Sequence, residues 1–259
     1  MSSLYSTASS SPKIYFGGGP NNIVADKNHV FELRTYSIKP EQLSEFVALT
    51  KENMQHKTKY DAKLRGAWVS ELGPTNQFVQ LWEFESLDKR AAIRKQLDSD
   101  KEWTQYLKQA RPMIITPESI ILKQFPWSKL NLPQDHFENK QVWELRTYQT
   151  KPGLVGKYIL LILMNILLYV SSSCLGSETF QKGFGERSKY SSPSGVFFSE
   201  VGKLNVLVHL WPYDNFEHRT NVRDEALKND TWRQTVTDTM PLLDNMESKT
   251  LLPVSFPKL

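Results

Sequence analysis

Two sets of charged side chains recur along this 259-residue chain, and their types suit two kinds of chemistry. An arginine guanidinium binds a carboxylate or phosphate through paired hydrogen bonds, whether that anion belongs to a ligand or to the protein itself. The arginines are Arg34, Arg90, Arg94, Arg146, Arg219 and Arg223, and the glutamates are Glu32, Glu71, Glu118, Glu144, Glu200 and Glu247. Because the two sets are equal in number, we expect structural ion pairs, with a pocket for an anionic ligand as the alternative.

Four of these arginines fall on predicted helices, at positions that are normally apolar. A helix over about 87–97, read at 3.6 residues per turn, places Arg90 and Arg94 inside its apolar arc. Arg219 and Arg223 fall in the same way among the apolar residues of a later predicted helix. A charge on a buried stripe needs a partner. We therefore expect strand glutamates to hold these arginines and lock helix to sheet.

Two matched tryptophans, Trp82 and Trp211, stand on predicted strands, where we expect them to fill the core. Beside Trp211, His209 takes the position that Gln80 has beside Trp82. A histidine and a tryptophan inside a barrel could flank a flat ligand such as haem. The plainer interpretation is a buried histidine with its hydrogen bonds satisfied.

The usual catalytic signatures are missing from the sequence. Gly17-Gly18-Gly19 lacks the following Lys-Ser/Thr of a phosphate-binding loop, and no zinc-protease, serine-hydrolase or Cys-x-x-Cys motif occurs. The histidines show no metal-ligand spacing, and the single cysteine, Cys174, excludes a disulfide framework. The net charge is 32 − 28 = +4, which does not call for nucleic acid. We predict no metal and no cofactor; the missing signatures favour a function other than catalysis, and an enzyme stays the alternative.

A tandem repeat explains why the charged sets recur. Residues 31–40 read FELRTYSIKP and residues 143–152 read WELRTYQTKP, at an offset of 143 − 31 = 112. Further on, residues 66–82 align with 195–211 at an offset of 195 − 66 = 129, and this offset then holds without a gap. The chain is therefore a duplication of one unit.

Each unit has a readable order of elements. Alternation predicts a strand over 29–37, a helix follows Lys39-Pro40, and 67–72 with 77–84 predict a hairpin. Ser86 and Asp100 are candidate N-caps of two further helices, and 119–125 is the last strand. This β-α-β-β-α-β order is ferredoxin-like. Since 78–84 is apolar on both alternations, we expect the α+β units to cover each other's bare faces, as in dimeric α+β barrels.

The predicted boundaries follow from the repeat and from composition. Residues 1–28 are expected to be disordered or a targeting segment, because they are rich in Ser, Gly and Asn without periodicity. The first ferredoxin-like unit spans 29–125, a linker with two prolines spans 126–140, and the second unit spans 141–259.

The second unit contains an anomalous apolar insertion near 158–175. The offset grows by 129 − 112 = 17 residues there, and the run YILLILMNILLYV begins at Tyr158. Thirteen helical residues would span about 20 Å, short of the roughly 30 Å bilayer interior, so no transmembrane span is expected. A buried helix is one alternative. We favour another, that the run is translated non-coding sequence or a splice variant.

Several motifs together strongly resemble the NIPSNAP family. They are FELRTY followed by KP, GAWVSELG, LWEFESLDKRAAIR, DKEW and the terminal LLPVSF. The resemblance covers about 29–259, except a window near 154–190. It implies a tandem dimeric α+β barrel, a mitochondrial setting in the matrix or at its periphery, and links to vesicular traffic and to recruitment of mitophagy adaptors. It brings no catalytic residues.

The sequence therefore favours a non-enzymatic mitochondrial interaction or adaptor protein of the NIPSNAP type, active in mitochondrial quality control or vesicle-related processes. The alternative is a small-ligand-binding or oxygenase-like α+β barrel that takes haem or an aromatic ligand. We expect protein partners, peripheral membrane contact at most, a homo-oligomer as one possibility and no nucleic acid. The N-terminal segment has no arginine, although transit peptides are rich in it, so the cytoplasm stays the alternative location.

Overall fold

The computed structural model describes residues 29–125, 128, 130–132, 141–155, 157 and 183–256. The same order of elements occurs twice in these residues. The first unit holds β1 (Val30–Ile38), α1 (Leu43–Asn53), α2 (Gln55–Thr58), β2 (Lys63–Leu72), β3 (Gln77–Phe84), α3 (Leu87–Asp98), α4 (Lys101–Ala110) and β4 (Ile114–Gln124). The second holds β5 (Val142–Thr150), α6 (Gly183–Tyr190), β6 (Gly195–Val201), β7 (Val206–Tyr213), α7 (Phe216–Lys228), α8 (Asp230–Thr239) and β8 (Leu243–Pro253).

Side-chain caps begin the helices where the sequence predicts them. The Ser86 hydroxyl accepts a hydrogen bond from the backbone N–H of Lys89 at the start of α3. Asp100 accepts two backbone N–H bonds at the start of α4, one of them from Trp103. Such caps satisfy donors that the helix itself leaves unpaired, which is worth about 1 kcal/mol each. Both predicted helix starts are confirmed.

The eight described strands close into one barrel in the order β1-β3-β2-β8-β5-β7-β6-β4. Within each unit the first strand pairs antiparallel with the third and the fourth, as in a ferredoxin-like sheet. The two sheets meet where β2 pairs with β8 and where β4 pairs with β6. The expected α+β barrel of tandem ferredoxin-like units is confirmed.

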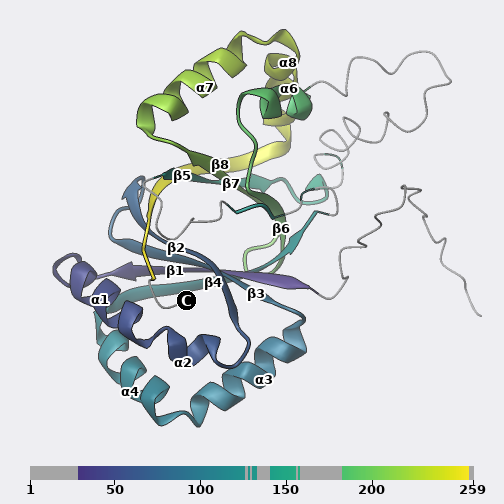
Figure 1. Cartoon of the computed structure of the whole chain (residues 1–259). Helices are drawn as coiled ribbons and strands as arrows, with labels where there is room; N and C mark the ends of the chain where they lie inside the picture. The colour runs from purple at the N-terminus through teal and green to yellow at the C-terminus, as the bar shows by residue number, and fades with distance from the viewer. Residues whose placement is uncertain are drawn as a thin grey trace, which may run out of the picture.

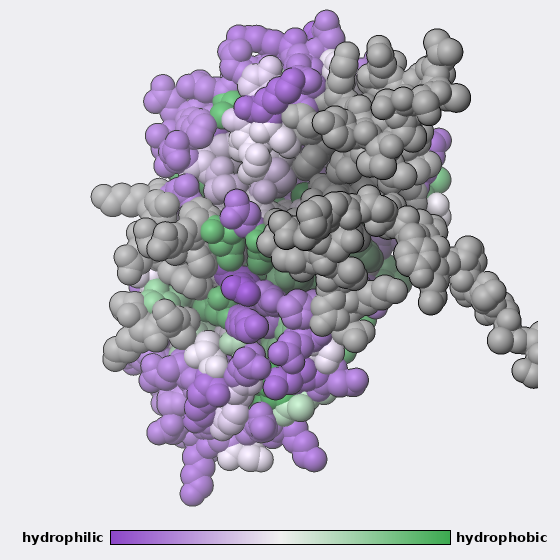
Figure 2. Space-filling view, turned by 45° about the vertical axis from the view of Figure 1, so that its right-hand side comes forward, coloured by the Kyte–Doolittle hydropathy of each residue, from purple (hydrophilic) through white to green (hydrophobic). Residues whose placement is uncertain are grey.

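The barrel lies between two helical layers (Figure 1). Helices α1–α4 cover the outer face of one sheet, and helices α6–α8 cover the outer face of the other. Apolar residues from both units fill the interior of the barrel, and the rings of Trp68 and Trp143 meet there with centroids 5.6 Å apart. Trp82 and Trp211 instead lie on the outer faces, beneath the helices. On the face seen in Figure 2, hydrophilic residues mostly cover the two helical ends and hydrophobic ones gather in the central band.

Several sequence predictions fall on residues outside this description. These are the N-terminal segment 1–28, most of the linker 126–140, and the apolar insertion near 158–175, so the boundaries and the origin of the insertion stay predictions. Among the described helices, none has both the length and the apolar character that crossing a membrane requires.

Candidate functional site

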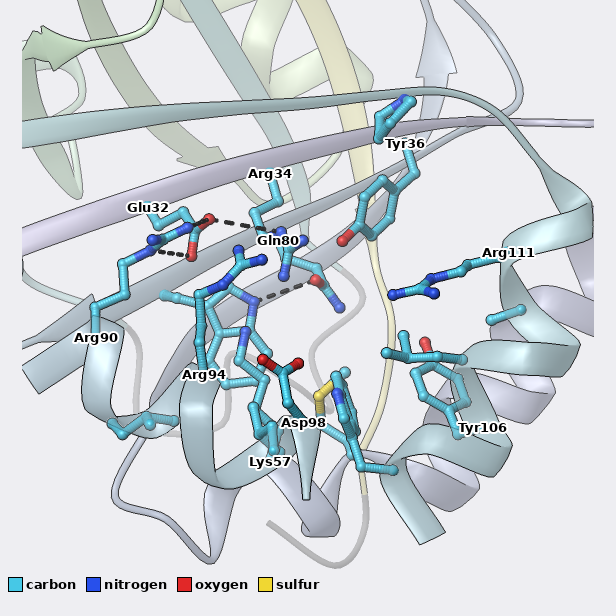
Figure 3. Close-up of a pocket in the computed structure, with 18 of the residues that line it drawn as sticks. Glu32, Arg34, Tyr36, Lys57, Gln80, Arg90, Arg94, Asp98, Tyr106 and Arg111 are labelled. Atoms are coloured by element: carbon cyan, nitrogen blue, oxygen red, sulfur yellow. Dashed lines mark hydrogen bonds and ion pairs between the residues drawn. The ribbon is translucent and has the colours of Figure 1, made fainter. Parts of the chain in front are cut away.

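A cavity of about 360 Å³ lies between the outer face of the first sheet and α2, α3 and α4 (Figure 3). Strands β1 and β3 supply its floor, because alternate residues of a strand point to the same face. Glu32, Arg34 and Tyr36 come from β1, and Gln80 and Trp82 come from β3. The helices supply the opposite wall, so the charged residues of helix and sheet converge on one space.

Glu32 is the anchor of this charged cluster. It is only 1 % exposed, and its carboxylate accepts two hydrogen bonds from Arg90, from Nε at 3.1 Å and from an Nη at 2.6 Å. The Ser119 hydroxyl donates a third bond at 2.6 Å, and Arg34 Nε lies 3.7 Å away. A paired arginine and carboxylate of this kind ties α3 to β1, as the sequence predicts for Arg90.

The electrostatics of the cluster keep Glu32 ionised. Burial alone would raise the pKa of the carboxyl, but the hydrogen bonds from Arg90 and Ser119 and the charge of Arg34 outweigh burial and lower that pKa to about 2. The phenol of Tyr106 is buried, which raises its pKa to about 12, and it shares a hydrogen bond of 3.1 Å with the Thr50 hydroxyl. At neutral pH Glu32 is therefore an ionised carboxylate and Tyr106 is a neutral phenol.

Two further arginines line the cavity without such an anchor. Arg94 lies one turn after Arg90 on α3, and Arg111 follows the end of α4. Among the described residues neither forms an ion pair, although the Asp98 carboxylate also lines the cavity. The buried Nε of Arg34 has no hydrogen-bond partner in the described part of the chain. The guanidinium groups of Arg94 and Arg111, and the Nε of Arg34, therefore have hydrogen-bond donors that a ligand could accept from.

Lys57 of α2 reaches the floor of the same cavity. Its Nζ lies 3.4 Å from the centroid of the Trp82 ring, close enough for a cation–π contact. The indole N–H of Trp82 donates to the Gln80 side-chain oxygen at 3.1 Å, which fixes the plane of the ring. Burial lowers the pKa of Lys57 well below its ordinary value, and the charge of Arg34 adds to this.

The second unit repeats the carboxylate cluster with more partners. Glu144 accepts hydrogen bonds from Arg219 at 2.7 Å and from the Ser248 hydroxyl at 2.5 Å. Arg223 and Arg146 lie 3.6 and 3.7 Å from the same oxygen. Burial would raise the pKa of Glu144, but these partners outweigh burial and lower it. In this unit all the predicted arginines therefore meet one glutamate.

A smaller cavity of about 230 Å³ lies beside this second cluster. Arg187 of α6 takes the place of Lys57, with its guanidinium carbon 4.5 Å from the centroid of the Trp211 ring. His209 is buried against Tyr148, with ring centroids 4.8 Å apart, and burial lowers its pKa to about 3. The ring is therefore neutral at physiological pH. His209 lines this cavity beside Trp211, and the haem interpretation stays a prediction.

The remaining predicted glutamates do not join either cluster, which corrects the expectation that each arginine has its own strand glutamate. Glu71, Glu118 and Glu247 are exposed on strands β2, β4 and β8. Glu200 is exposed on β6 and lies 3.2 Å from Lys123. Glu118 and Glu247 lie opposite Thr35 and Thr147, on the strand faces that alternate with those of Glu32 and Glu144. Glu71 and Glu200 lie where the registers of β2 with β8 and of β4 with β6 shift, and both are exposed.

Sequence reasoning missed Lys57, Arg111 and Arg187, because each lies on a helical turn that only the fold brings over the sheet. One signal was available for Arg111: it aligns with Met240 at the constant offset of 129, so the first unit carries a charge that the second lacks. Tyr106, which aligns with Thr235, is a second such difference. Both differences make the first cavity more polar and more aromatic than the second.

One group of metal-ligand types occurs among the described residues, formed by His56, Asp100 and Glu102. Asp100 already accepts hydrogen bonds from two backbone N–H groups, from the Tyr60 hydroxyl at 2.9 Å and from Lys59 at 2.6 Å. The oxygens of Asp100 thus cap α4 and pair with Tyr60 and Lys59, which is a structural role.

Comparison with known proteins gives one family. A family model described as NIPSNAP matches residues 31–129 and 174–258. The protein NipSnap homolog of Dictyostelium discoideum is 41% identical over 233 residues, which cover 89% of this chain and 90% of that protein. The protein NipSnap homolog 2 of Homo sapiens is 25% identical over 240 residues, covering 90% of this chain and 77% of that protein.

Solved structures support the fold. The crystal structure of an anthrone oxidase-like protein superposes with a TM-score of 0.58 over 90% of this chain and 94% of that chain. Its sequence identity is 11%, so the similarity shows a shared α+β barrel and carries no activity over.

Proposed function

The chain belongs to the NIPSNAP family, and we propose that its first unit binds a small ligand that joins a negative charge to a flat apolar group. The observation that carries this proposal is the charge of the first cavity. Four arginines line it, Arg34, Arg90, Arg94 and Arg111, against the carboxylates of Glu32 and Asp98. The excess is 4 − 2 = 2 positive charges before Lys57 is counted. An anion would balance this excess.

The shape and the walls of the cavity support the apolar part of the ligand. A volume of about 360 Å³ falls within the roughly 300–1,000 Å³ of small-molecule sites. The rings of Tyr36, Trp82, Trp103 and Tyr106 line it, which suits a flat group stacked beside the charged one. Figure 3 shows Arg94 and Arg111 approaching the cavity from different helical segments, with Tyr106 below Arg111.

Isothermal titration of the full chain with 4-methylbenzoate tests the proposal. We expect binding of 4-methylbenzoate and no detectable binding of the uncharged 4-methylbenzyl alcohol. A hydrogen bond to a charged group contributes about 1.5–3 kcal/mol, so Arg94→Gln should weaken binding at least about tenfold. Lys95→Gln is the matched control, because Lys95 is the next residue of α3 and is exposed. Equal binding of acid and alcohol, or equal effects of the two variants, would overturn the proposal.

A second function is supported by family membership: an adaptor that meets protein partners in mitochondria, in quality control or vesicle-related processes. The observation that favours it is a set of exposed apolar side chains at the ends of both hairpins. Leu72 is 55 % exposed beside the first hairpin turn, and Leu204 is 56 % exposed in the second. Such groups gain free energy when a partner covers them.

Fluorescence of the full chain with a C-terminal tag tests the location that this function requires. We expect the signal to coincide with mitochondria, and a diffuse cytosolic signal would contradict the adaptor function. Affinity capture from a mitochondrial lysate tests the partner surface. Leu204→Asp should lose the partners that the unaltered chain captures, whereas Lys203→Asp, a change at the neighbouring exposed residue, should retain them.

A further inference from the structure

Of the described residues that line the first cavity, Lys57 is the one lysine, and it is only 4 % exposed. We propose that its side-chain amine condenses with the carbonyl group of an anionic aldehyde or ketone held in this cavity, forming an imine. The inference rests on the proposed function, since the arginines must first hold the anionic end of the ligand. It adds a chemical class of ligand and a covalent step.

The contacts of the Lys57 amine leave its lone pair available. Among the described residues its Nζ has no hydrogen bond or ion pair, and its close contact is the face of Trp82 at 3.4 Å. Lys59, two residues later in the chain, differs: its Nζ lies 2.6 Å from Asp100 and it is exposed. A buried amine without an acidic partner on the floor of a cavity is placed to attack a ligand.

The charges around Lys57 favour the uncharged amine that such an attack needs. Burial has the largest effect and lowers its pKa, and the positive charges of Arg34, Arg90 and Arg94 lower the pKa further. Glu32 acts in the opposite sense, but Arg90 already pairs with it at 2.6 Å. The Asp98 carboxylate lines the cavity and is exposed, so solvent screens it.

The proposed step balances without an oxidant or a reductant. The lone pair of Nζ attacks the carbonyl carbon and forms a carbon–nitrogen bond. Both amine hydrogens then leave with the carbonyl oxygen as one molecule of water, and a carbon–nitrogen double bond remains. Arg94 and Arg111 would hold the carboxylate or phosphate of the ligand, while Trp82 and Tyr106 flank its flat part. The cavity thus selects a carbonyl compound that is also an anion.

The second unit offers a comparison within the same chain. Arg187 lies over Trp211 as Lys57 lies over Trp82, and it donates a hydrogen bond to the Tyr213 hydroxyl at 3.0 Å. A guanidinium keeps its charge in proteins and does not act as an amine nucleophile. Within the part of the chain that the structure describes, the imine site therefore belongs to the first unit. The comparison also shows that an arginine fits over a tryptophan in this fold, so Lys57→Arg is a structurally matched variant.

The test is reductive trapping in the full chain. The protein is incubated at pH 7 with 4-formylbenzoate and cyanoborohydride, which reduces an imine to a stable amine, and labelled lysines are located by peptide mass mapping. Each unit by which a lysine pKa falls raises its uncharged fraction tenfold. We expect Lys57 to be labelled at least about tenfold faster than Lys59. Addition of 4-methylbenzoate should suppress the labelling, and uncharged benzaldehyde should label Lys57 more slowly than 4-formylbenzoate does, because it lacks the carboxylate that the arginines hold.

Two controls separate this inference from the proposed function. Lys57→Arg should melt as the unaltered chain does and lose the fast labelling. Lys95→Gln, at an exposed position of α3 outside the cavity lining, should bind 4-methylbenzoate and keep the fast labelling of Lys57. If 4-methylbenzoate binds and Lys57 is labelled no faster than Lys59, the imine inference is wrong and the binding function stands. If neither binding nor fast labelling occurs, both are wrong. Fast labelling that 4-methylbenzoate does not suppress would also overturn the inference, because the amine would then react outside the anion site.

Discussion

Replacing Arg90 by methionine removes the main partner of a buried carboxylate, and this makes it the sharpest test of the structural ion pair. Glu32 would lose hydrogen bonds of 3.1 and 2.6 Å and keep only the Ser119 hydroxyl and Arg34 at 3.7 Å. Removing one partner of a buried pair costs about 3–5 kcal/mol. Because Glu32 keeps two other contacts, we expect a loss of about 3 kcal/mol, at the lower end of this range. That is a large share of the roughly 5–15 kcal/mol by which a protein is stable.

Thermal unfolding of the full chain measures this loss. For a chain of this size about 1 kcal/mol shifts the melting temperature by about 2–4 °C, so Arg90→Met should melt about 6–12 °C lower. Arg94→Met is the matched control, on the same helix face and without an ion pair among the described residues. A surface change of that kind should cost less than about 0.5 kcal/mol. Adding Glu32→Gln to Arg90→Met should recover part of the loss, because the two residues are coupled.

The pH dependence gives an independent check with a definite sign. Folding lowers the pKa of Glu32 from 4.5 to about 2, so its stabilising contribution is complete above pH 4.5 and is lost as the pH falls towards 2. The difference between the unaltered chain and Arg90→Met should shrink over the same window. If Arg90→Met melts within 2 °C or so of Arg94→Met at pH 7, or if their difference does not change in acid, the pair is not a structural clamp.

Three further predictions concern stability. Arg219→Met should cost less than Arg90→Met in the same unfolding assay, because Glu144 keeps Arg223 at 3.6 Å, Arg146 at 3.7 Å and Ser248; an equal or larger loss would contradict this. Burial lowers the pKa of His209 from 6.5 to about 3. Between these two pH values the unfolded chain binds a proton at this histidine and the folded chain does not, so the free energy of unfolding should fall as the pH drops from about 6.5 to 3. His209→Gln, which introduces the residue found at position 80, should flatten that part of the stability profile, and an unchanged profile would refute the assignment. Gly66→Ala should cost about 1–3 kcal/mol in urea unfolding, because its new Cβ would overlap the Trp68 ring; a neutral result would show that the ring can move.

The sequence predicted the barrel because the repeat and the alternation report directly on faces of strands. Residues 78–84 are apolar on both alternations, and β3 packs its two faces against the barrel interior and the helices. The position of Arg90 within an apolar arc likewise predicted a buried partner, and Glu32 is that partner.

The same reasoning failed where recurrence was taken as evidence of contact. Glu71 and Glu200 recur because the unit was duplicated, and duplication copies exposed residues as faithfully as buried ones. Lys57 was missed for the opposite reason, since nothing matches it at the offsets of the repeat and only the packing of α2 on the sheet brings it over Trp82. Which side chains share a cavity depends on how the helices cross the strands, and periodicity does not report that angle.

A crystal structure of the full chain with 4-bromobenzoate tests whether the first cavity binds a flat anion, because the anomalous signal of bromine locates the ligand independently. We expect a bromine peak in the first-unit cavity between Trp82 and Tyr106, with the carboxylate of the ligand within hydrogen-bond distance of Arg94 or Arg111. A cavity without a bromine peak at saturating ligand, or bromine found only in the second unit or on the surface, would contradict it.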